Sequence, residues 1–291
     1  FPQLIAGPIV HHKEMMPQFE SDKNKKIIWE NISKGLFLFF IGLAKKVAIA
    51  DTLAIWANDG FQNYLNLNTA EAWVTSLSYT LQLYFDFSGY CDMAMGIALL
   101  FNIKLPVNFY SPYKARNIQD FWRRWHMTLN RFLTQYIYIP LGGSRKGTAR
   151  TYLNIFIVFF ISGFWHGAGW TFIIWGILHG VASMIVRGWG KLNIKLPYWF
   201  SWFITFQFVN AAWVYFRATS VEQANVILAK MFTVDLGSFT NLFTHALPFA
   251  GAKAFDYGIF TLDNPKVVVP FILLFLLVTF VMKNSIQQLE S

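Results

Sequence analysis

Histidines and arginines lie beside strongly apolar sequence between residues 121 and 180. The stretch FWRRWHMTLNRFLTQYIYIPLGGSRKG holds His126 within an arginine cluster, and the stretch FWHGAGWTFIIWGILHG holds His166 and His179. A histidine at membrane depth is costly to charge and is rare without a function. We therefore take these three histidines as the first candidates for chemistry.

His166 lies in a Trp-His-Gly sequence between Gly163 and Gly169. The glycines would let a substrate or another backbone approach closely, and Trp165 and Trp170 could line an apolar tunnel. A neutral imidazole with a near-neutral pKa suits a general base that deprotonates a hydroxyl. A buried histidine that hydrogen-bonds to a neighbouring helix explains the same spacing, so both interpretations stay open.

His126 follows Arg123, Arg124 and Trp125. Neighbouring cations favour the neutral form of its imidazole. The two arginines could bind a phosphate group of a substrate, and anchoring to anionic lipid explains them equally well. We take both arginines, together with Trp125 and Trp165, as candidate substrate-binding residues.

The histidine spacing argues against a metal site. On one straight helix, His166 and His179 would lie about 20 Å apart along the axis and on different faces. The sequence has no HExxH pattern, and a single cysteine, Cys91, excludes an internal disulfide and a cysteine-based zinc site. We expect no metal, and we expect His179 to be a packing residue in a helix rich in small residues.

Polar residues also interrupt the long apolar segment from Glu71 to Phe101. Ser88 and Asp92 share one helix face, and Asp86 and Tyr90 share another. Small and polar residues at this depth suit close helix packing or a cavity lining. We keep Asp86 and Asp92 as candidate substrate-binding residues without assigning them a chemical step.

The composition indicates a polytopic helical membrane protein. Of 291 residues, 55% are hydrophobic, 19% are aromatic and only 13% are charged, whereas a soluble domain carries about 25% charged residues. The formal charge of +9 does not indicate a nucleic-acid partner, because the basic residues fall in short clusters between apolar runs, as topology signals do.

The elements that must position these residues are apolar helices within a single membrane-embedded domain over residues 1–291. Lys45 and Lys46 interrupt the first helix, so we expect its span to end near Leu43, before an amphipathic piece in which Asp51 pairs with a lysine. We expect about six or seven membrane segments, no internal repeat, and the GGSRKG turn on the cytoplasmic side. The expected helices are 27–56, 71–101, 151–164, 170–186, 198–216, 223–232 and 267–282. We expect an interfacial amphipathic segment over 121–141. We expect loops over 102–120 and 236–265, and a loop or re-entrant segment over 1–18.

Four motifs in order resemble the membrane-bound O-acyltransferase superfamily, in particular its bacterial alginate O-acetyltransferase branch. They are FPQLIAGPIV, LQLYFDFSGYCDMAMGIALLFNIKLPVNFYSPY, FWRRWHMTLNRFLTQYIYIPLGG and FWHGAGWTFIIWGILHG. The resemblance covers residues 1 to about 180 and lacks the family's N-terminal spans. Because the chain also begins without Met, we expect it to be a fragment.

The resemblance implies an all-α ring of tilted transmembrane helices, with re-entrant and interfacial helices around a central tunnel. It implies that His166 is catalytic and that His126 is a second functional residue. The expected donor is acetyl-CoA or an acyl carrier, with no tightly bound cofactor. The expected acceptor is a hydroxyl of an exported polysaccharide such as alginate, reached through a periplasmic acetyl-transfer partner from the bacterial inner membrane.

A transporter or channel is the alternative function. In that case Asp86, Asp92 and the histidines would form a proton or ion relay. It predicts inverted repeats, which the sequence does not show. A membrane metalloenzyme, with a site built by tertiary contacts, is a third possibility.

Overall fold

A computed structural model describes residues 7–233, 235, 237 and 265–289. The regular structure of these residues is helical throughout, which confirms the expected all-α class. The longer helices are α1 (His12–Glu20), α2 (Trp29–Ala44), α3 (Asp51–Gln62), α4 (Thr69–Leu100), α7 (Thr148–His166), α8 (Trp170–Trp189), α9 (Tyr198–Arg217), α10 (Val221–Phe232) and α12 (Pro265–Val281). The short segments are η1 (Asp22–Lys25), η2 (Lys45–Ala50), η3 (Pro112–Lys114), α5 (Ile118–Trp122), α6 (Met127–Leu133), η4 (Thr134–Tyr138) and α13 (Ser285–Leu289).

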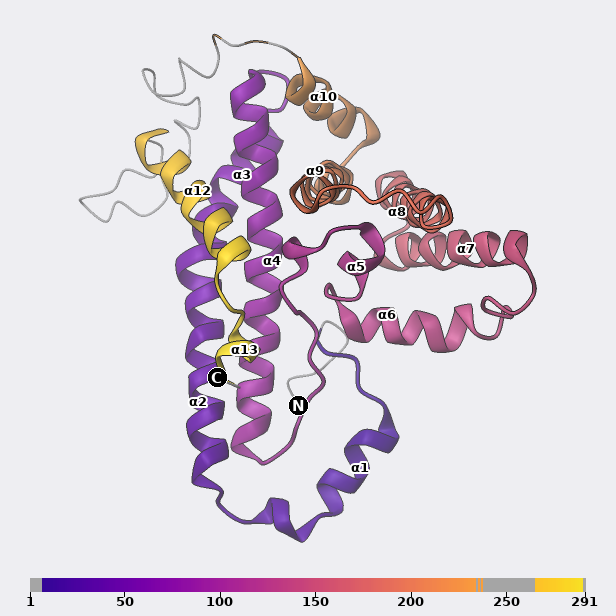
Figure 1. Cartoon of the computed structure of the whole chain (residues 1–291). Coiled ribbons are helices and arrows are strands. Elements are labelled where there is room, and N and C mark those ends of the chain that lie inside the picture. Colours follow the sequence, from indigo (N-terminus) through magenta and orange to yellow (C-terminus); the bar gives the residue numbers. More distant parts are fainter. Residues whose placement is uncertain (1–6, 234, 236, 238–264, 290–291) are drawn as a thin grey trace.

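Helices α2 and α4 form a long antiparallel pair (Figure 1). Glycines let their backbones touch: a Cβ added at Gly42 would lie 2.5 Å from the Gly89 carbonyl oxygen, and one added at Gly96 would lie 2.6 Å from that of Gly35. Without a hydrophobic driving force between helices in lipid, such close contact is a main source of helix association. The 32 residues of α4 extend about 48 Å, longer than the roughly 30 Å hydrocarbon core.

Helix α2 ends at Ala44, one residue after Leu43, and where its membrane span ends stays a prediction. A π-helical segment, η2, continues α2 directly into α3. Carboxylates neutralise the two lysines that suggested an end: Lys45 pairs with Asp92 of α4, and Lys46 pairs with both Asp86 of α4 and Asp51. The predicted pairing of Asp51 with a lysine is confirmed, and the helix can continue because neither cation is left alone.

Helices α7 and α8 form a second close pair. A Cβ added at Gly163 would lie 2.5 Å from the Phe172 carbonyl oxygen, and one added at Gly176 would lie 2.5 Å from that of Phe159. Among the described residues these two helices are long and apolar enough to cross a membrane, and Val267–Val281 is a shorter apolar helix. The predicted helices over 151–164, 170–186, 198–216 and 223–232 are confirmed as α7 to α10.

The amphipathic segment predicted over 121–141 is divided, because the chain breaks at His126 between α5 and α6. Residues 12–20, expected to lie partly in a loop, form α1 with Pro17 inside it. The predicted loop 236–265 lies outside the described residues except for residues 237 and 265. The ring of tilted helices and its central tunnel stay a prediction of the family resemblance.

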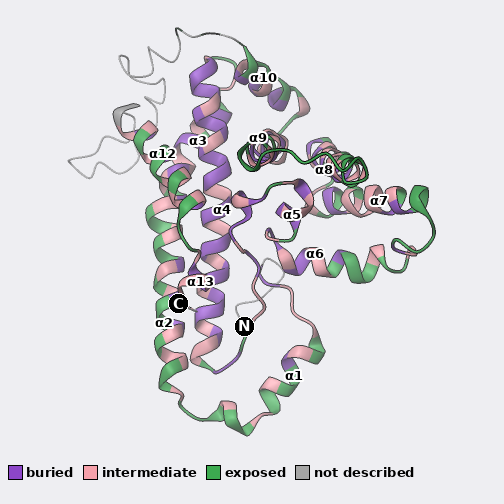
Figure 2. Ribbon diagram, in the orientation of Figure 1, coloured by how far each residue is buried: buried purple, intermediate pink, exposed green. Residues whose placement is uncertain are grey.

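Buried residues line the face of α4 that meets α2, α3 and α9 (Figure 2). Helix α5 lies between α4 and the α7–α8 pair, and α6 runs below α7 (Figure 1). An aromatic core joins these layers, and Trp125, Trp175 and Trp213 are buried within it. This arrangement brings the turn at His126 towards the end of α7 at His166.

Candidate active site

A short backbone ladder holds the turn between α5 and α6. The N–H of Met127 donates to the Asn108 carbonyl at 3.0 Å, and the N–H of Tyr110 donates to the Arg124 carbonyl at 2.9 Å. Between them, His126 adopts a left-handed conformation, with φ 44° and ψ 52°. A non-glycine residue in this region costs free energy and persists only where its surroundings hold it.

The imidazole of His126 is buried against one polar partner and one ring. Its Nδ1 lies 3.1 Å from Asn108 Oδ1, and the ring of Phe87 packs edge-on with centroids 4.8 Å apart. Burial lowers the pKa of His126, and the nearby His166 lowers that pKa further. The site therefore holds a neutral imidazole, and it places His126 within electrostatic range of His166.

Asn108 is a site residue that the sequence analysis missed. It is fully buried and contacts His126 from the loop between α4 and η3. Its position between Pro106 and Pro112 is typical of an ordinary loop residue. The one available signal was its place inside the motif NFYSPY, just before the arginine-rich motif.

The ring of His166 lies at the end of α7 in an aromatic setting. The ring centroids of Trp165, Trp175 and Phe216 lie 5.0, 5.2 and 5.0 Å from that of His166. Trp165 is 47% exposed and Trp170 is 72% exposed. Within the described residues these two tryptophans therefore face outward, while Trp175 and Phe216 enclose the histidine.

His166 and His179 lie on two separate helices, as predicted, and not on one straight helix. The chain turns at Gly167 and Gly169, and α8 packs back along α7. Trp175 contacts both histidine rings, with centroids 5.2 Å from His166 and 4.9 Å from His179. One tryptophan ring therefore lies between them.

His179 lies in the aromatic core, as expected for a packing residue. It is fully buried, and its Nδ1 accepts a hydrogen bond from Trp122 Nε1 at 3.3 Å. Rings of Phe208 and Trp213 also contact it. Trp125 is likewise a core residue, 4% exposed and stacked on Phe121, so its indole packs the core instead of facing a pocket.

The two candidate arginines have different surroundings. Arg124 Nε donates to Asp120 Oδ1 at 2.8 Å, so its charge is neutralised within the turn. Arg123 lines a pocket of about 280 Å³ together with Arg187 from the end of α8. Within the described part of the chain, neither Arg123 nor Arg187 forms an ion pair.

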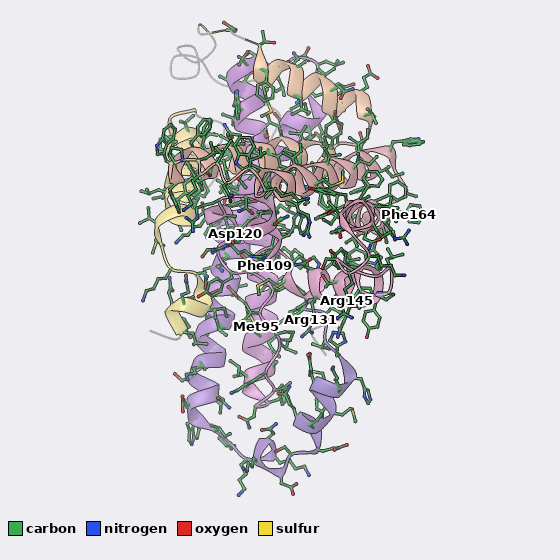
Figure 3. The ribbon with its side chains drawn as sticks, turned by 45° about the vertical axis from the view of Figure 1, so that its right-hand side comes forward. Met95, Phe109, Asp120, Arg131, Arg145 and Phe164 are labelled. Carbon is green, nitrogen blue, oxygen red and sulfur yellow. The ribbon has the colours of Figure 1, made fainter. Side chains whose placement is uncertain are left out.

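This pocket has both polar and apolar walls. Side chains that can donate hydrogen bonds surround the two arginines, and apolar side chains of α7 close one side. Figure 3 shows the ribbon around it, with Asp120 and Arg131 labelled on α5 and α6. The other lining residues are Gln119, Trp122, Asn130, Thr134, Tyr138, Ile155, Val158, Phe159 and Ser183.

Asp86 and Asp92 belong to the interface between α4 and the η2 segment. Asp92 Oδ2 lies 2.6 Å from Lys45 Nζ at a buried position, and Asp86 Oδ1 lies 2.8 Å from Lys46 Nζ at a half-exposed one. Both carboxylates are already neutralised by a lysine. This pairing explains their presence at membrane depth without a substrate.

No metal centre is evident in the part of the chain that the structure describes, where no group of three His, Cys, Asp or Glu side chains could hold an ion. The described fold is that of a helical membrane protein, with two histidine candidates in aromatic surroundings and a pocket lined by two arginines. The chain belongs to the membrane-bound O-acyltransferase family, because that family's model matches residues 1–222. The family is named for acyltransferases, so membership favours that class of function over the transporter alternative.

Curated relatives agree with this family. The chain is 51% identical to "Peptidoglycan O-acetyltransferase" of Helicobacter pylori, over 100% of this chain and 56% of that protein. It is 42% identical to "Probable alginate O-acetylase AlgI" of Pseudomonas aeruginosa, over 83% of this chain and 46% of that protein. It is 27% identical to "Teichoic acid D-alanyltransferase" of Bacillus subtilis, over 67% of this chain and 51% of that protein. The chain spans about half the length of the curated relatives it matches.

Proposed function

We propose that this chain carries the catalytic histidines of a membrane O-acetyltransferase that moves acetyl groups towards hydroxyls of a cell-envelope polysaccharide. We place it in the bacterial inner membrane as a multi-pass protein, with the GGSRKG turn in the cytoplasm. Family membership and the names of its relatives support the reaction class. The observation that carries the assignment of residues is a run of ring contacts between the two histidine sites: Trp125, next to His126 in the chain, contacts Trp213, and Trp213 stacks on Trp175, which contacts His166.

His166 is the general base in this proposal. Its imidazole takes the proton of the attacking hydroxyl while the hydroxyl oxygen forms a bond to the acetyl carbonyl carbon. The carbon–sulfur bond of the thioester donor then breaks, and the departing thiolate takes the proton back from His166. The histidine is unchanged at the end, and no redox partner or resident cofactor is needed.

The donor in this proposal is an acetyl thioester on a phosphate-bearing carrier, either acetyl-CoA or an acyl carrier. The pocket between Arg123 and Arg187 supports it, because two guanidinium groups without carboxylate partners among the described residues suit a phosphate. Phe159, in the pocket wall, precedes His166 by seven residues on α7, about 10 Å along the axis. A donor bound there needs a long arm between phosphate and thioester, as both candidates have.

The acceptor hydroxyl in this proposal belongs to an exported glycan. Identity to the peptidoglycan enzyme, 51%, exceeds identity to the alginate protein, 42%, so peptidoglycan is the first acceptor to test and alginate the second. A periplasmic protein that completes the transfer to the glycan is part of the proposal. The hydroxyl that His166 deprotonates is then either that of the glycan or that of a carrier that relays the acetyl group outward.

Replacement of His166 tests the assignment. The variant His166→Ala should lower acetyl transfer roughly 100- to 10,000-fold while the protein accumulates normally in membranes. The measurement is acetate released by mild base from the glycan of cells that depend on this protein. His12→Ala is the matched control, because His12 is exposed on α1. Full acetylation with His166→Ala would show that another residue is the base.

A further inference from the structure

The side-chain amide of Asn108 has a determined orientation. The backbone N–H of Thr128 can only donate, and it lies 3.2 Å from the Asn108 oxygen; the Thr128 hydroxyl donates to the same oxygen at 2.9 Å. That hydroxyl in turn accepts from the N–H of Ile9 at 3.0 Å, so it has its proton available for Asn108. On the other side, Asn108 Nδ2 donates to Cys91 Sγ at 3.4 Å. The oxygen, and not the nitrogen, therefore faces His126.

This orientation decides which nitrogen of His126 carries the proton. Asn108 Oδ1 has lone pairs and no proton, and it lies 3.1 Å from His126 Nδ1. An unprotonated Nδ1 would place two lone pairs against each other in a buried site, whereas a protonated Nδ1 makes a hydrogen bond. The neutral ring carries one proton, which leaves Nε2 as a hydrogen-bond acceptor.

We propose that Asn108 is a positioning residue that holds His126 in its Nδ1–H form, so that His126 Nε2 accepts a hydrogen bond from a hydroxyl of the acceptor that neighbours the attacking one. This inference rests on the proposed acetyl transfer and sharpens it. A thioester carbonyl oxygen needs a hydrogen-bond donor, and in this form Nε2 offers none. His126 therefore orients the acceptor and not the acetyl group, while His166 takes the proton of the attacking hydroxyl.

The arrangement explains the backbone conformation of His126. The ladder from Asn108 to Met127 and from Tyr110 to Arg124 pulls the turn against the loop. The left-handed φ of 44° directs the imidazole back towards Asn108. The surrounding hydrogen bonds offset the free-energy cost of this conformation, and the result is a fixed orientation of the imidazole ring. Hydrogen-bond partners behind a functional histidine commonly fix its ring in this way.

The experiment combines nitrogen NMR of labelled histidine with acetyl transfer in nanodiscs. Comparison with His126→Gln assigns the His126 signals, and the nitrogen shifts tell a protonated from an unprotonated ring nitrogen. Wild type should show a protonated Nδ1. Asn108→Leu removes the acceptor at similar volume, so the Nε2–H form should appear and transfer should fall roughly 10- to 100-fold, the usual effect of losing such a partner.

Two variants complete the test. Asn108→Asp keeps an acceptor oxygen, so it should keep Nδ1–H and, at alkaline pH, stay within about tenfold of wild type, well above Asn108→Leu. Thr128→Val removes a hydroxyl from the same oxygen without touching His126, and it should keep both the Nδ1–H form and the rate. Retention of Nδ1–H in Asn108→Leu, or equal loss of transfer in Thr128→Val, overturns the proposal.

The proposal and the underlying function fail in different ways. If His126→Gln transfers acetyl groups at the wild-type rate, Nε2 does not orient the acceptor, and the proposal is overturned while the role of His166 stands. If His166→Ala is fully active, the proposed base is wrong, yet the nitrogen signals of His126 still report the effect of Asn108. Thermal unfolding of each variant separates loss of fold from loss of function, and Asn108→Asp keeps the test decisive if Asn108→Leu does not fold.

Discussion

Lys45 Nζ lies 2.6 Å from Asp92 Oδ2, and both side chains are nearly buried, 14% and 5% exposed. This ion pair joins the π-helical segment η2 to the middle of α4. Lys46 pairs with Asp86, six residues before Asp92 on α4, but that pair is 40% and 44% exposed. The two neighbouring lysines therefore form the same kind of ion pair with α4, one buried and one partly exposed to solvent.

We expect Asp92→Asn to destabilise the protein strongly. It would leave the Lys45 ammonium buried without its counter-charge, a change that costs about 3–5 kcal/mol in buried pairs. Thermal unfolding in detergent or nanodiscs measures the effect. The double variant Lys45→Met with Asp92→Leu should regain most of the loss, because it removes both charges together.

Asp86→Asn is the matched control for that prediction. Solvent already screens the Lys46 pair, and Asp51 remains as a second partner for Lys46, so the loss should stay near 0–1 kcal/mol, roughly the value of exposed pairs. Equal losses for Asp92→Asn and Asp86→Asn would mean that burial does not distinguish the two pairs.

The sequence predicted most helices but not this junction. Apolar segments mark α4, α7, α8 and α9 without knowledge of any contact. Lys45 looked like an end of the helix because a lone cation at that depth is costly. Its partner Asp92 is 47 residues away, and no local pattern connects them. The local pair of Lys46 with Asp51 was predictable because it lies within the same helical stretch.

We expect Gly42→Leu to separate α2 from α4. A Cβ there would already lie 2.5 Å from the Gly89 carbonyl and 2.8 Å from the backbone nitrogen of Met93, so the helices must shift apart. Overpacking of this kind costs typically about 1–3 kcal/mol. Gly190→Leu is the control, since its nearest atoms lie at 3.6 Å and its φ is ordinary. A lower unfolding temperature for the control than for Gly42→Leu would contradict the packing argument.

The site was predictable in its histidines but not in its geometry. His126 and His166 stood out because polar side chains are rare beside apolar helices. The break at His126 was not predictable, because helix periodicity continues through the turn and only the contact with the 108–110 loop holds the left-handed conformation. Arg187 was missed for a similar reason: it joins Arg123 through the fold, 64 residues later in the chain.

We expect Asn108→Asp to change the pH dependence of transfer. A carboxylate beside Nδ1 favours the imidazolium form, so it raises the pKa of His126, which burial lowers in the wild type. Transfer needs neutral His126 and is lost as the pH falls through that pKa. The acid limb of the rate profile should therefore move to higher pH in the variant. An unchanged acid limb would show that the protonation state of His126 does not limit the reaction.

We expect removal of the arginine pair to weaken donor binding specifically. Hydrogen bonds to a charged group contribute about 1.5–3 kcal/mol, so Arg123→Gln and Arg187→Gln should each raise KM for a phosphate-bearing acetyl donor roughly 10- to 100-fold, with kcat nearly unchanged. Arg145→Gln, in the exposed turn after η4, should leave both parameters at wild-type values.

Acetyl-CoA and an acetylated carrier protein, tested side by side, show which of the two donors the arginine pair binds through its phosphate. A donor analogue with an acetyl-pantetheine thioester but no phosphate should bind the wild type and the two variants alike. If the variants lose affinity for that analogue as well, the arginines support the pocket structurally and do not bind the phosphate.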